Sequence, residues 1–147
     1  MSILYTNADS LGNKIKELEL LIDSLADRPT VIAITEVKSK AKNWNLKLSE
    51  FNLKGYNIIS NDLDKYARGI IMYLDKNIEF SIIESSIAFQ EYILLKIKMI
   101  DQSELILCVI YRSPNSTDEN NKLLFEIFDY VNNLNKKVIL VGDFNLS

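Results

Sequence analysis

The chain has 147 residues, of which 48% are hydrophobic and 25% charged, and these values suit one globular domain with a sizeable core. A net charge of -3 with scattered lysines excludes the dense basic surface that captures nucleic acid by charge alone. One cysteine excludes an internal disulfide, and neither a leader peptide nor a bilayer-spanning apolar stretch is visible, so we expect an intracellular protein, nuclear or cytoplasmic, with no membrane contact.

The N-terminal part has the pattern of a β-α-β unit. Residues 2–6 and 31–35 are predicted to be strands. Between them, apolar residues recur at spacings of three and four, which predicts one amphipathic helix over 11–25. Asp9 or Ser10 is placed to cap the start of this helix. Strands joined by such a helix are expected to be parallel, with a right-handed crossover.

The middle of the chain is predicted to be a long connection over 37–54, with one short helical turn, followed by several strands. The expected strands are 56–59, 69–74, 78–83, 91–100 and 104–111. The breaks at 75–77 and 101–103 are short enough for antiparallel hairpins. After Pro114, the spacing of Ser116 and Glu119 predicts a capping box for a second amphipathic helix, with apolar positions from Leu124 to Leu134. The fold class is therefore α/β.

The last predicted strand, 138–141, contains only β-branched residues and leucine, which is typical of a central strand buried on both faces. It leads directly into the sequence Gly142-Asp143-Phe144-Asn145. Because side chains alternate along a strand, Asp143 and Asn145 are expected on one side and Phe144 on the other. A carboxylate and an amide at the carboxyl end of a strand form the kind of polar pair that α/β proteins use for ligands and metals.

Polar residues also follow three other apolar strands, namely Asn7, Glu36 and Tyr111. If these strand ends lie at one edge, they converge with Asp143 and Asn145 and offer oxygen ligands to a hard cation. Magnesium, with manganese as the alternative ion, is favoured over zinc because the chain has no histidine. Each residue also has a purely structural alternative: a helix-capping turn for Asn7, a solvated strand end for Glu36 and a core-edge aromatic for Tyr111.

These segments resemble the endonuclease/exonuclease/phosphatase superfamily, which includes deoxyribonuclease I, and most of all the endonuclease domains of non-long-terminal-repeat retrotransposons. The matching pieces occur in the order of the family and span the chain: Asn7, Ile-Thr-Glu at 34–36, Ala-Arg-Gly-Ile at 67–70, Val-Ile-Tyr-Arg-Ser-Pro at 109–114, and Val-Gly-Asp-Phe-Asn at 141–145.

The resemblance implies a four-layer α/β/β/α sandwich and magnesium-dependent hydrolysis of a phosphodiester, with DNA as the substrate. It assigns the metal to Glu36, with Asn7 as a neighbouring ligand or orienting group. Asp143 is then the residue that orients and deprotonates the attacking water. Asn145 and Tyr111 are the residues that hydrogen-bond the phosphate oxygens.

Two arginines in the matching pieces, Arg68 and Arg112, are candidate contacts to the DNA backbone, with a solvated surface position as the alternative for each. Members of the superfamily continue past this motif to a late Asp-His pair, which this histidine-free chain lacks. We therefore expect residues 1–147 to be a single domain corresponding to the N-terminal two-thirds of the family's domain. An unfinished sheet of this kind predicts self-association.

The predicted function is that of a DNA-nicking endonuclease of retrotransposon type, with activity impaired by truncation. Two alternatives remain open. One is a catalytically inactive remnant that binds a metal or a partner, because groups that act as a unit in catalysis fail together. The other is a phosphomonoesterase of the same superfamily, which shares the core motifs.

Overall fold

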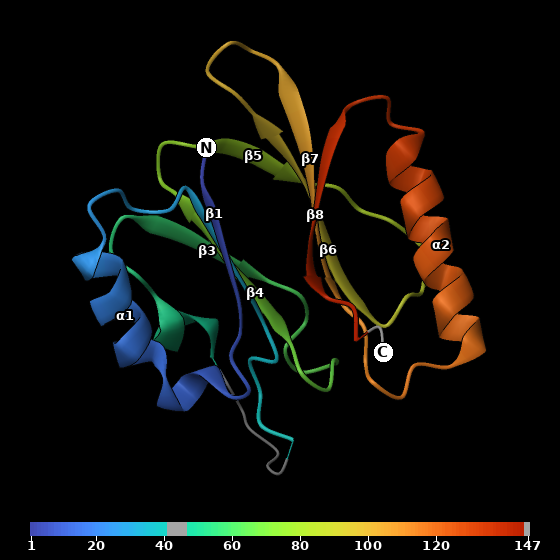
Figure 1. Cartoon of the computed structure of the whole chain (residues 1–147), viewed down its shortest axis with the longest axis horizontal. Coiled ribbons are helices and arrows are strands. Elements are labelled where there is room, and N and C mark those ends of the chain that lie inside the picture. Colours follow the sequence, from blue (N-terminus) through green and yellow to red (C-terminus); the bar gives the residue numbers. More distant parts are fainter. Residues whose placement is uncertain (41–46, 146–147) are drawn as a thin grey trace. The chain divides into compact units, whose positions relative to one another are not determined.

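The computed structural model describes residues 1–40 and 47–145, and it divides into two units, Met1–Asn77 and Ile78–Ser147. Each unit contains a four-stranded sheet and one α-helix, as Figure 1 shows. The two α-helices have 10 and 15 residues. Within the described residues, no helix is long and apolar enough to cross a membrane.

The first unit has the strand order β1-β2-β4-β3. Its strands are β1 (Ile3–Asn7), β2 (Val31–Thr35), β3 (Tyr56–Ser60) and β4 (Ile70–Asp75). β1 and β2 are parallel, as the β-α-β pattern predicts, whereas β4 runs antiparallel to β2. The first residues of β4 therefore lie beside the carboxyl end of β2. This arrangement gathers three chain segments at one edge of the sheet.

Helix α1 (Ile15–Ser24) covers one face of this sheet (Figure 1). Leu18 and Ile22 of the helix belong to the same buried cluster as Ile32 and Ile34 of β2. Burying side chains of this size contributes roughly 1.5–3 kcal/mol each. The spacing that predicted an amphipathic helix here thus reflects its packing on the sheet.

The predicted helix over 11–25 is wrong at its first turn. The structure has a separate 3-10 turn, η1 (Leu11–Asn13), before α1, and neither Asp9 nor Ser10 caps a helix with its side chain. Both residues have positive φ, 43° and 84°, because the chain turns there. The turn brings the amides of Ser10 and Leu11 to the carbonyls of Glu36 and Val37, at 2.9 and 2.8 Å.

The connection after β2 contains a short 3-10 turn, η2 (Leu48–Phe51), which confirms the predicted helical turn. The part of the predicted connection at 41–46 lies outside the described residues.

The second unit has the strand order β5-β6-β7-β8. Its strands are β5 (Glu79–Ile82), β6 (Glu91–Lys98), β7 (Glu104–Tyr111) and β8 (Lys137–Asp143). β6 and β7 form the antiparallel hairpin predicted around 101–103, and β8 is parallel to β7. Helix α2 (Asp118–Asn132) packs Leu124, Ile127 and Val131 against one face of the sheet.

Two predictions about strand pairing are wrong. The hairpin expected at 75–77 does not form, because β4 already pairs with β2 and β3, and β5 pairs with β6 in the other sheet. The last strand is not buried on both faces. Within the described residues β8 is the outer strand of its sheet, and Leu140 is 41% exposed.

The predicted capping box at the start of the second helix is displaced by one residue. Thr117 is the cap, and its hydroxyl accepts a hydrogen bond from the amide of Asn120 at 3.1 Å. Ser116 instead donates its hydroxyl to the side-chain oxygen of Asn121 at 2.8 Å. The Ser-x-x-Glu spacing predicted the right region but the wrong residue, because Thr117 offers the same capping chemistry.

Cys108 provides a probe of the core beneath α2. It is fully buried in β7, and burial raises the pKa of its thiol to about 12. The thiolate is the reactive form, so we expect a thiol reagent at pH 8 to modify the folded chain at least about 100-fold more slowly than the chain in urea. The measurement is the absorbance of released thionitrobenzoate. Equal rates with and without urea would show that this core is open.

Candidate active site

The carboxyl ends of β1 and β2 lie side by side in the first unit. Asn7 and Thr35 are paired in register at the last position of each strand, and the amide of Ala8 donates to the carbonyl of Thr35 at 3.0 Å. The side-chain oxygen of Asn7 accepts the amide of Asp9 at 3.2 Å, so Asn7 belongs to a local turn, but the cap residues of η1 and α1 are Ser10 and Lys14. This bond leaves the position of Asn7 at the strand end well defined.

Glu36, directly after β2, has a left-handed backbone with φ 53°. Such a conformation is uncommon for a residue with a long side chain, and it is found preferentially where the surrounding structure enforces it at functional sites. Here the backbone is held from two sides. The carbonyl of Glu36 accepts the amide of Ser10 at 2.9 Å, and the next two amides donate to the carbonyls of Gly69 and Arg68 at 3.3 and 2.7 Å.

Arg68 fixes the carboxylate of Glu36. Its Nη2 lies 3.2 Å from Oε2 of Glu36 and 2.8 Å from Oδ1 of Asp9, and its Nε donates to the carbonyl of Lys38 at 3.0 Å. The side chain of Arg68 is 6% exposed and that of Glu36 is 13% exposed. The alternatives of a solvated strand end for Glu36 and a solvated surface position for Arg68 are therefore wrong.

The carboxyl ends of β7 and β8 form the corresponding edge of the second unit. Tyr111 and Asp143 are paired in register, and the ladder continues with the amide of Arg112, which donates to the carbonyl of Asp143 at 2.8 Å. Gly142 makes this close pairing possible. A Cβ atom at position 142 would lie 1.9 Å from the carbonyl oxygen of Ile110.

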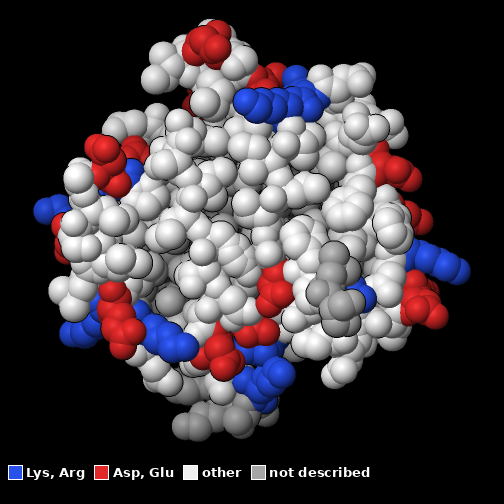
Figure 2. Space-filling view, viewed as in Figure 1, with Lys and Arg blue, Asp and Glu red and all other residues white. Residues whose placement is uncertain are grey.

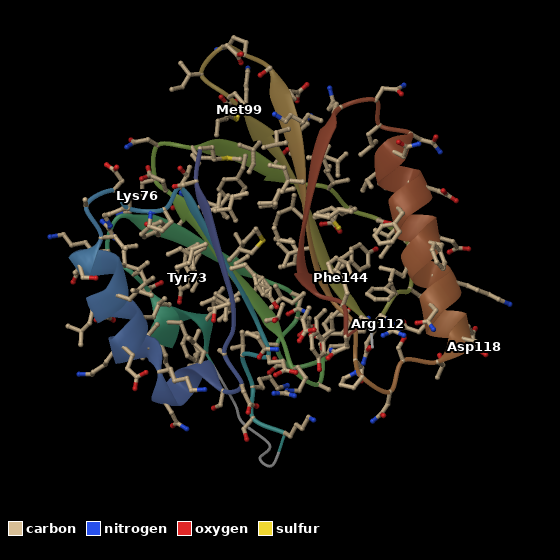
Figure 3. All side chains as sticks on the ribbon, in the orientation of Figure 1. Tyr73, Lys76, Met99, Arg112, Asp118 and Phe144 are labelled. Atoms are coloured by element: carbon tan, nitrogen blue, oxygen red, sulfur yellow. The ribbon has the colours of Figure 1, made fainter. Side chains whose placement is uncertain are left out.

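Phe144 and Asn145, which follow β8, make different contacts. Phe144 packs against the cluster beneath α2, as strand alternation predicts, and Figure 3 shows it between β8 and the helix. Asn145 leaves the extended conformation with φ 45°, so alternation no longer decides where its side chain points. Its side-chain amide donates to the carbonyl of Arg112, and its main-chain amide donates to Oδ1 of Asp143 at 3.1 Å.

Solved structures with a similar arrangement of elements include three whose names refer to DNA or to an endonuclease. The AP endonuclease LMAP from Leishmania major matches with a TM-score of 0.76 at 14% identity, over 99% of this chain and 55% of its own. TDP2 from D. rerio, complexed with a single-strand DNA product, matches with a TM-score of 0.67 at 19% identity, over 100% of this chain and 61% of its own. The endonuclease domain of TRAS1, a telomere-specific non-LTR retrotransposon, matches with a TM-score of 0.66 at 15% identity, over 99% and 60%.

The chain has the deoxyribonuclease I-like fold. This confirms the fold class and, at the level of the fold, the resemblance to the endonuclease/exonuclease/phosphatase superfamily. The chain spans 55–61% of the length of the three structures named above. No family model matches the sequence, and no curated protein matches it.

In this deoxyribonuclease I-like chain, the predicted site residues fall into two sets. Asn7 and Glu36 lie together at the carboxyl edge of the first sheet, and Tyr111, Asp143 and Asn145 lie together at that of the second. That the two sets act on one substrate stays a prediction.

The first set contains oxygen atoms of the kinds that hard divalent cations bind. One carboxylate oxygen of Asp9 and one of Glu36 lie 2.8 and 3.2 Å from Nη2 of Arg68, and the side-chain oxygen of Asn7 accepts the main-chain amide of Asp9. Oxygen ligands of this kind suit magnesium or manganese, which retain several water ligands. Among the described residues no three side chains of the types His, Cys, Asp and Glu form a metal-binding group.

Two residues near these edges were missed as site candidates. Asp9 was considered only as a helix cap, although it follows Asn7 at the same spacing at which Asn145 follows Asp143. Glu91, 1% exposed, is the cross-strand partner of Tyr111, which is 2% exposed. The turn at 101–103 alone could not have predicted this pair, because the observed register is centred on residue 101, with Lys98 opposite Glu104, whereas a turn centred on 102 would shift every partner by two positions.

The face drawn in Figure 2 shows no dense cluster of lysine and arginine side chains among the described residues. Among the described residues visible there, lysine and arginine side chains lie singly or in small groups beside acidic ones. This distribution agrees with the scattered lysines of the sequence.

Proposed function

We propose that this chain is a magnesium-dependent phosphodiester hydrolase that nicks DNA, in the manner of a non-LTR retrotransposon endonuclease. The observation that carries the proposal is that polar residues gather at the carboxyl edge of each sheet. Glu36, Asn7 and Asp9 lie at this edge of the first sheet, and Asp143, Asn145 and Tyr111 lie at this edge of the second sheet. The deoxyribonuclease I-like fold supports the same chemistry, because solved proteins with this fold include the two endonucleases named above.

In the proposed mechanism the first unit holds the metal through Glu36, with Asn7 as a neighbouring ligand and Asp9 as a further carboxylate. When bound, magnesium supplies positive charge that offsets the negative charge of the phosphate oxygens. Arg68 keeps the carboxylate of Glu36 in place through its contact of 3.2 Å. The strained backbone at Glu36 supports this role, since three backbone hydrogen bonds around it maintain one carboxylate position.

The second unit supplies the groups that act on water and phosphate. Asp143 orients the attacking water and accepts its proton, which is the contribution of a general base. The side-chain amide of Asn145 and the hydroxyl of Tyr111 donate hydrogen bonds to phosphate oxygens as charge shifts in the transition state. A direct contact of Arg68 or Arg112 with DNA stays a prediction, and their internal hydrogen bonds favour another role.

A phosphomonoesterase acting on DNA ends is a second candidate. It is favoured by the structural match, at a TM-score of 0.64 and 14% identity, to a 3′ phosphatase from Neisseria that is bound to a product DNA hairpin. Release of inorganic phosphate from a 3′-phosphorylated oligonucleotide, without nicking of supercoiled plasmid, would select this candidate over the endonuclease.

The metal site is tested by Glu36→Gln, which removes the negative charge and preserves the side-chain size. We expect the affinity for Mn²⁺, measured from the free-ion signal in electron paramagnetic resonance, to fall at least about 10-fold. Glu126→Gln, at an exposed carboxylate on α2, is the matched control and is expected to leave the affinity unchanged. Equal affinities for both variants and the wild type would remove Glu36 from the metal site.

A further inference from the structure

Arg112 directs its guanidinium group into its own chain. Its Nη1 donates to the carbonyls of Phe144 and Asn145 at 3.0 and 2.9 Å, and its Nε donates to Oδ1 of Asn121 at 2.9 Å. Its main chain bonds to the same segment, since its amide donates to the carbonyl of Asp143 and its carbonyl accepts the side-chain amide of Asn145. One residue thus contacts every position from 143 to 145.

This segment needs such support because β8 ends at Asp143 and its ladder with β7 ends there. Beyond that point, the carbonyls of Phe144 and Asn145 require donors that the ladder no longer supplies. Nη1 of Arg112 donates to both carbonyls, and Nε in the same guanidinium plane donates to Asn121. A lysine ammonium carries a similar charge but has a single nitrogen, so it lacks the second donor atom that bonds Asn121.

The far side of the guanidinium is anchored at the start of α2. Oδ1 of Asn121 accepts hydrogen bonds from Nε of Arg112 and from the hydroxyl of Ser116. The hydroxyl oxygen of Ser116 in turn accepts a hydrogen bond from the side-chain amide of Asn120 at 2.8 Å. Oδ1 of Asn120 in turn accepts the amide of Gln90 at 3.1 Å. Figure 3 shows Arg112 below Phe144, between the end of β8 and Asp118 at the helix start. The network fixes the direction in which the guanidinium donates.

From this geometry, and resting on the proposed function, we propose that Arg112 is a positioning residue rather than a DNA contact. It fixes the segment 143–145, so that the carboxylate of Asp143 and the amide of Asn145 keep the positions that hydrolysis requires. Small displacements of catalytic groups reduce the rate strongly while leaving substrate binding intact. The effect of Arg112 therefore belongs to kcat, whereas a phosphate contact would contribute to binding.

The first test is Arg112→Lys, assayed by nicking of supercoiled plasmid with Mg²⁺ and by binding of a fluorescein-labelled DNA duplex without metal. We expect kcat to fall at least about 10-fold, with KM and the duplex Kd within about 2-fold of wild type and an unchanged salt dependence. A raised Kd with a salt slope smaller by about one, and an unchanged kcat, would identify a phosphate contact instead. Unchanged kcat, KM and Kd would equally overturn the proposal.

A second pair of variants changes only the anchor. Asn121→Asp keeps the oxygen that accepts Nε of Arg112, whereas Asn121→Leu removes it at similar volume. We expect the aspartate variant to retain kcat and the leucine variant to lower it, with both keeping the duplex Kd. Equal kcat values for the two variants would show that the hydrogen bond from Arg112 to Asn121 does not affect catalysis. Circular dichroism of each variant establishes that it is folded.

A third measurement does not depend on activity. We expect Arg112→Lys to lower the hydrogen-exchange protection of the Asn145 amide, resolved by NMR, at least about 10-fold. The amide of Asn77, which donates to Oδ1 of Asp75 at 2.9 Å in the first unit, serves as the internal control. Unchanged protection of Asn145 would overturn the positioning role. If the wild-type chain does not nick DNA, this exchange experiment still decides what Arg112 does, so failure of the proposed function is distinguishable.

Discussion

Asp143→Asn is expected to lower the rate of magnesium-dependent nicking at least about 100-fold, because an amide cannot accept the proton of the attacking water. The substitution keeps the side-chain size and leaves an oxygen that can accept the amide of Asn145, which the wild-type carboxylate binds at 3.1 Å. The register with Tyr111 depends on the backbone and is expected to survive. The measurement is the conversion of supercoiled to open-circular plasmid under single-turnover conditions.

Asp129→Asn is the matched control for this prediction. Asp129 is exposed on α2, so the same change of charge is expected to leave the nicking rate within about 2-fold of wild type. Binding of the DNA duplex without metal is expected to be equal in both variants. Nicking at the wild-type rate by Asp143→Asn would remove Asp143 from the catalytic groups.

Gly142→Ala is expected to have the largest effect on folding, a loss of roughly 3 kcal/mol or more in the free energy of unfolding. Gly142 has φ 149°, and an added Cβ would lie 1.9 Å from the carbonyl oxygen of Ile110. The neighbouring atom belongs to the backbone of β7, so it cannot move aside as a flexible side chain could. Relief requires β8 to separate from β7, which would displace Asp143 from Tyr111.

Gly12→Ala is the matched control, since a Cβ there meets no atom within 4 Å. We expect this variant to differ from wild type by less than about 1 kcal/mol. Urea unfolding followed by circular dichroism measures both variants. Equal midpoints for Gly142→Ala and Gly12→Ala would contradict the tight β7–β8 pairing.

Much of the fold could be predicted from the sequence because the local signals are strong. The period of three and four in 11–25 indicated a helix that packs on a sheet, and the turn at 101–103 set the hairpin of β6 and β7. The long apolar runs of β2 and β7 indicated buried strands. In β2, every residue from Val31 to Thr35 is buried. These features depend on residues that are close in sequence.

Apart from the displaced cap at Thr117, which is a local choice between neighbouring residues, the failed predictions concern contacts between distant residues. The sequence around 75–77 suits a hairpin, but β4 is already flanked by β2 and β3, a fact that no local pattern contains. The apolar run before Gly142 suggested a fully buried strand, whereas β8 pairs on one side only within the described residues. Asp9 was predicted as a cap and instead contacts Arg68, which is 59 positions further along the chain.

For the candidate site too, the sequence predicted local features but not long-range contacts. The polar residues at strand ends were recognisable, because the carboxyl ends of parallel strands lie at one edge of a sheet. The roles of the arginines were not, because a guanidinium group can contact DNA or its own backbone equally well. In the structure Arg68 contacts Glu36 and Arg112 contacts the segment 143–145.

The most direct test of the central claim is a nicking assay of the wild-type chain on supercoiled plasmid, with Mg²⁺ and with EDTA, alongside Glu36→Gln and Asp143→Asn. Magnesium-dependent hydrolysis of a phosphodiester predicts open-circular product from the wild type with Mg²⁺, none with EDTA, and at least about 100-fold less from either variant. No product from the folded wild-type chain with Mg²⁺, or nicking that persists in EDTA or in Asp143→Asn, would contradict it.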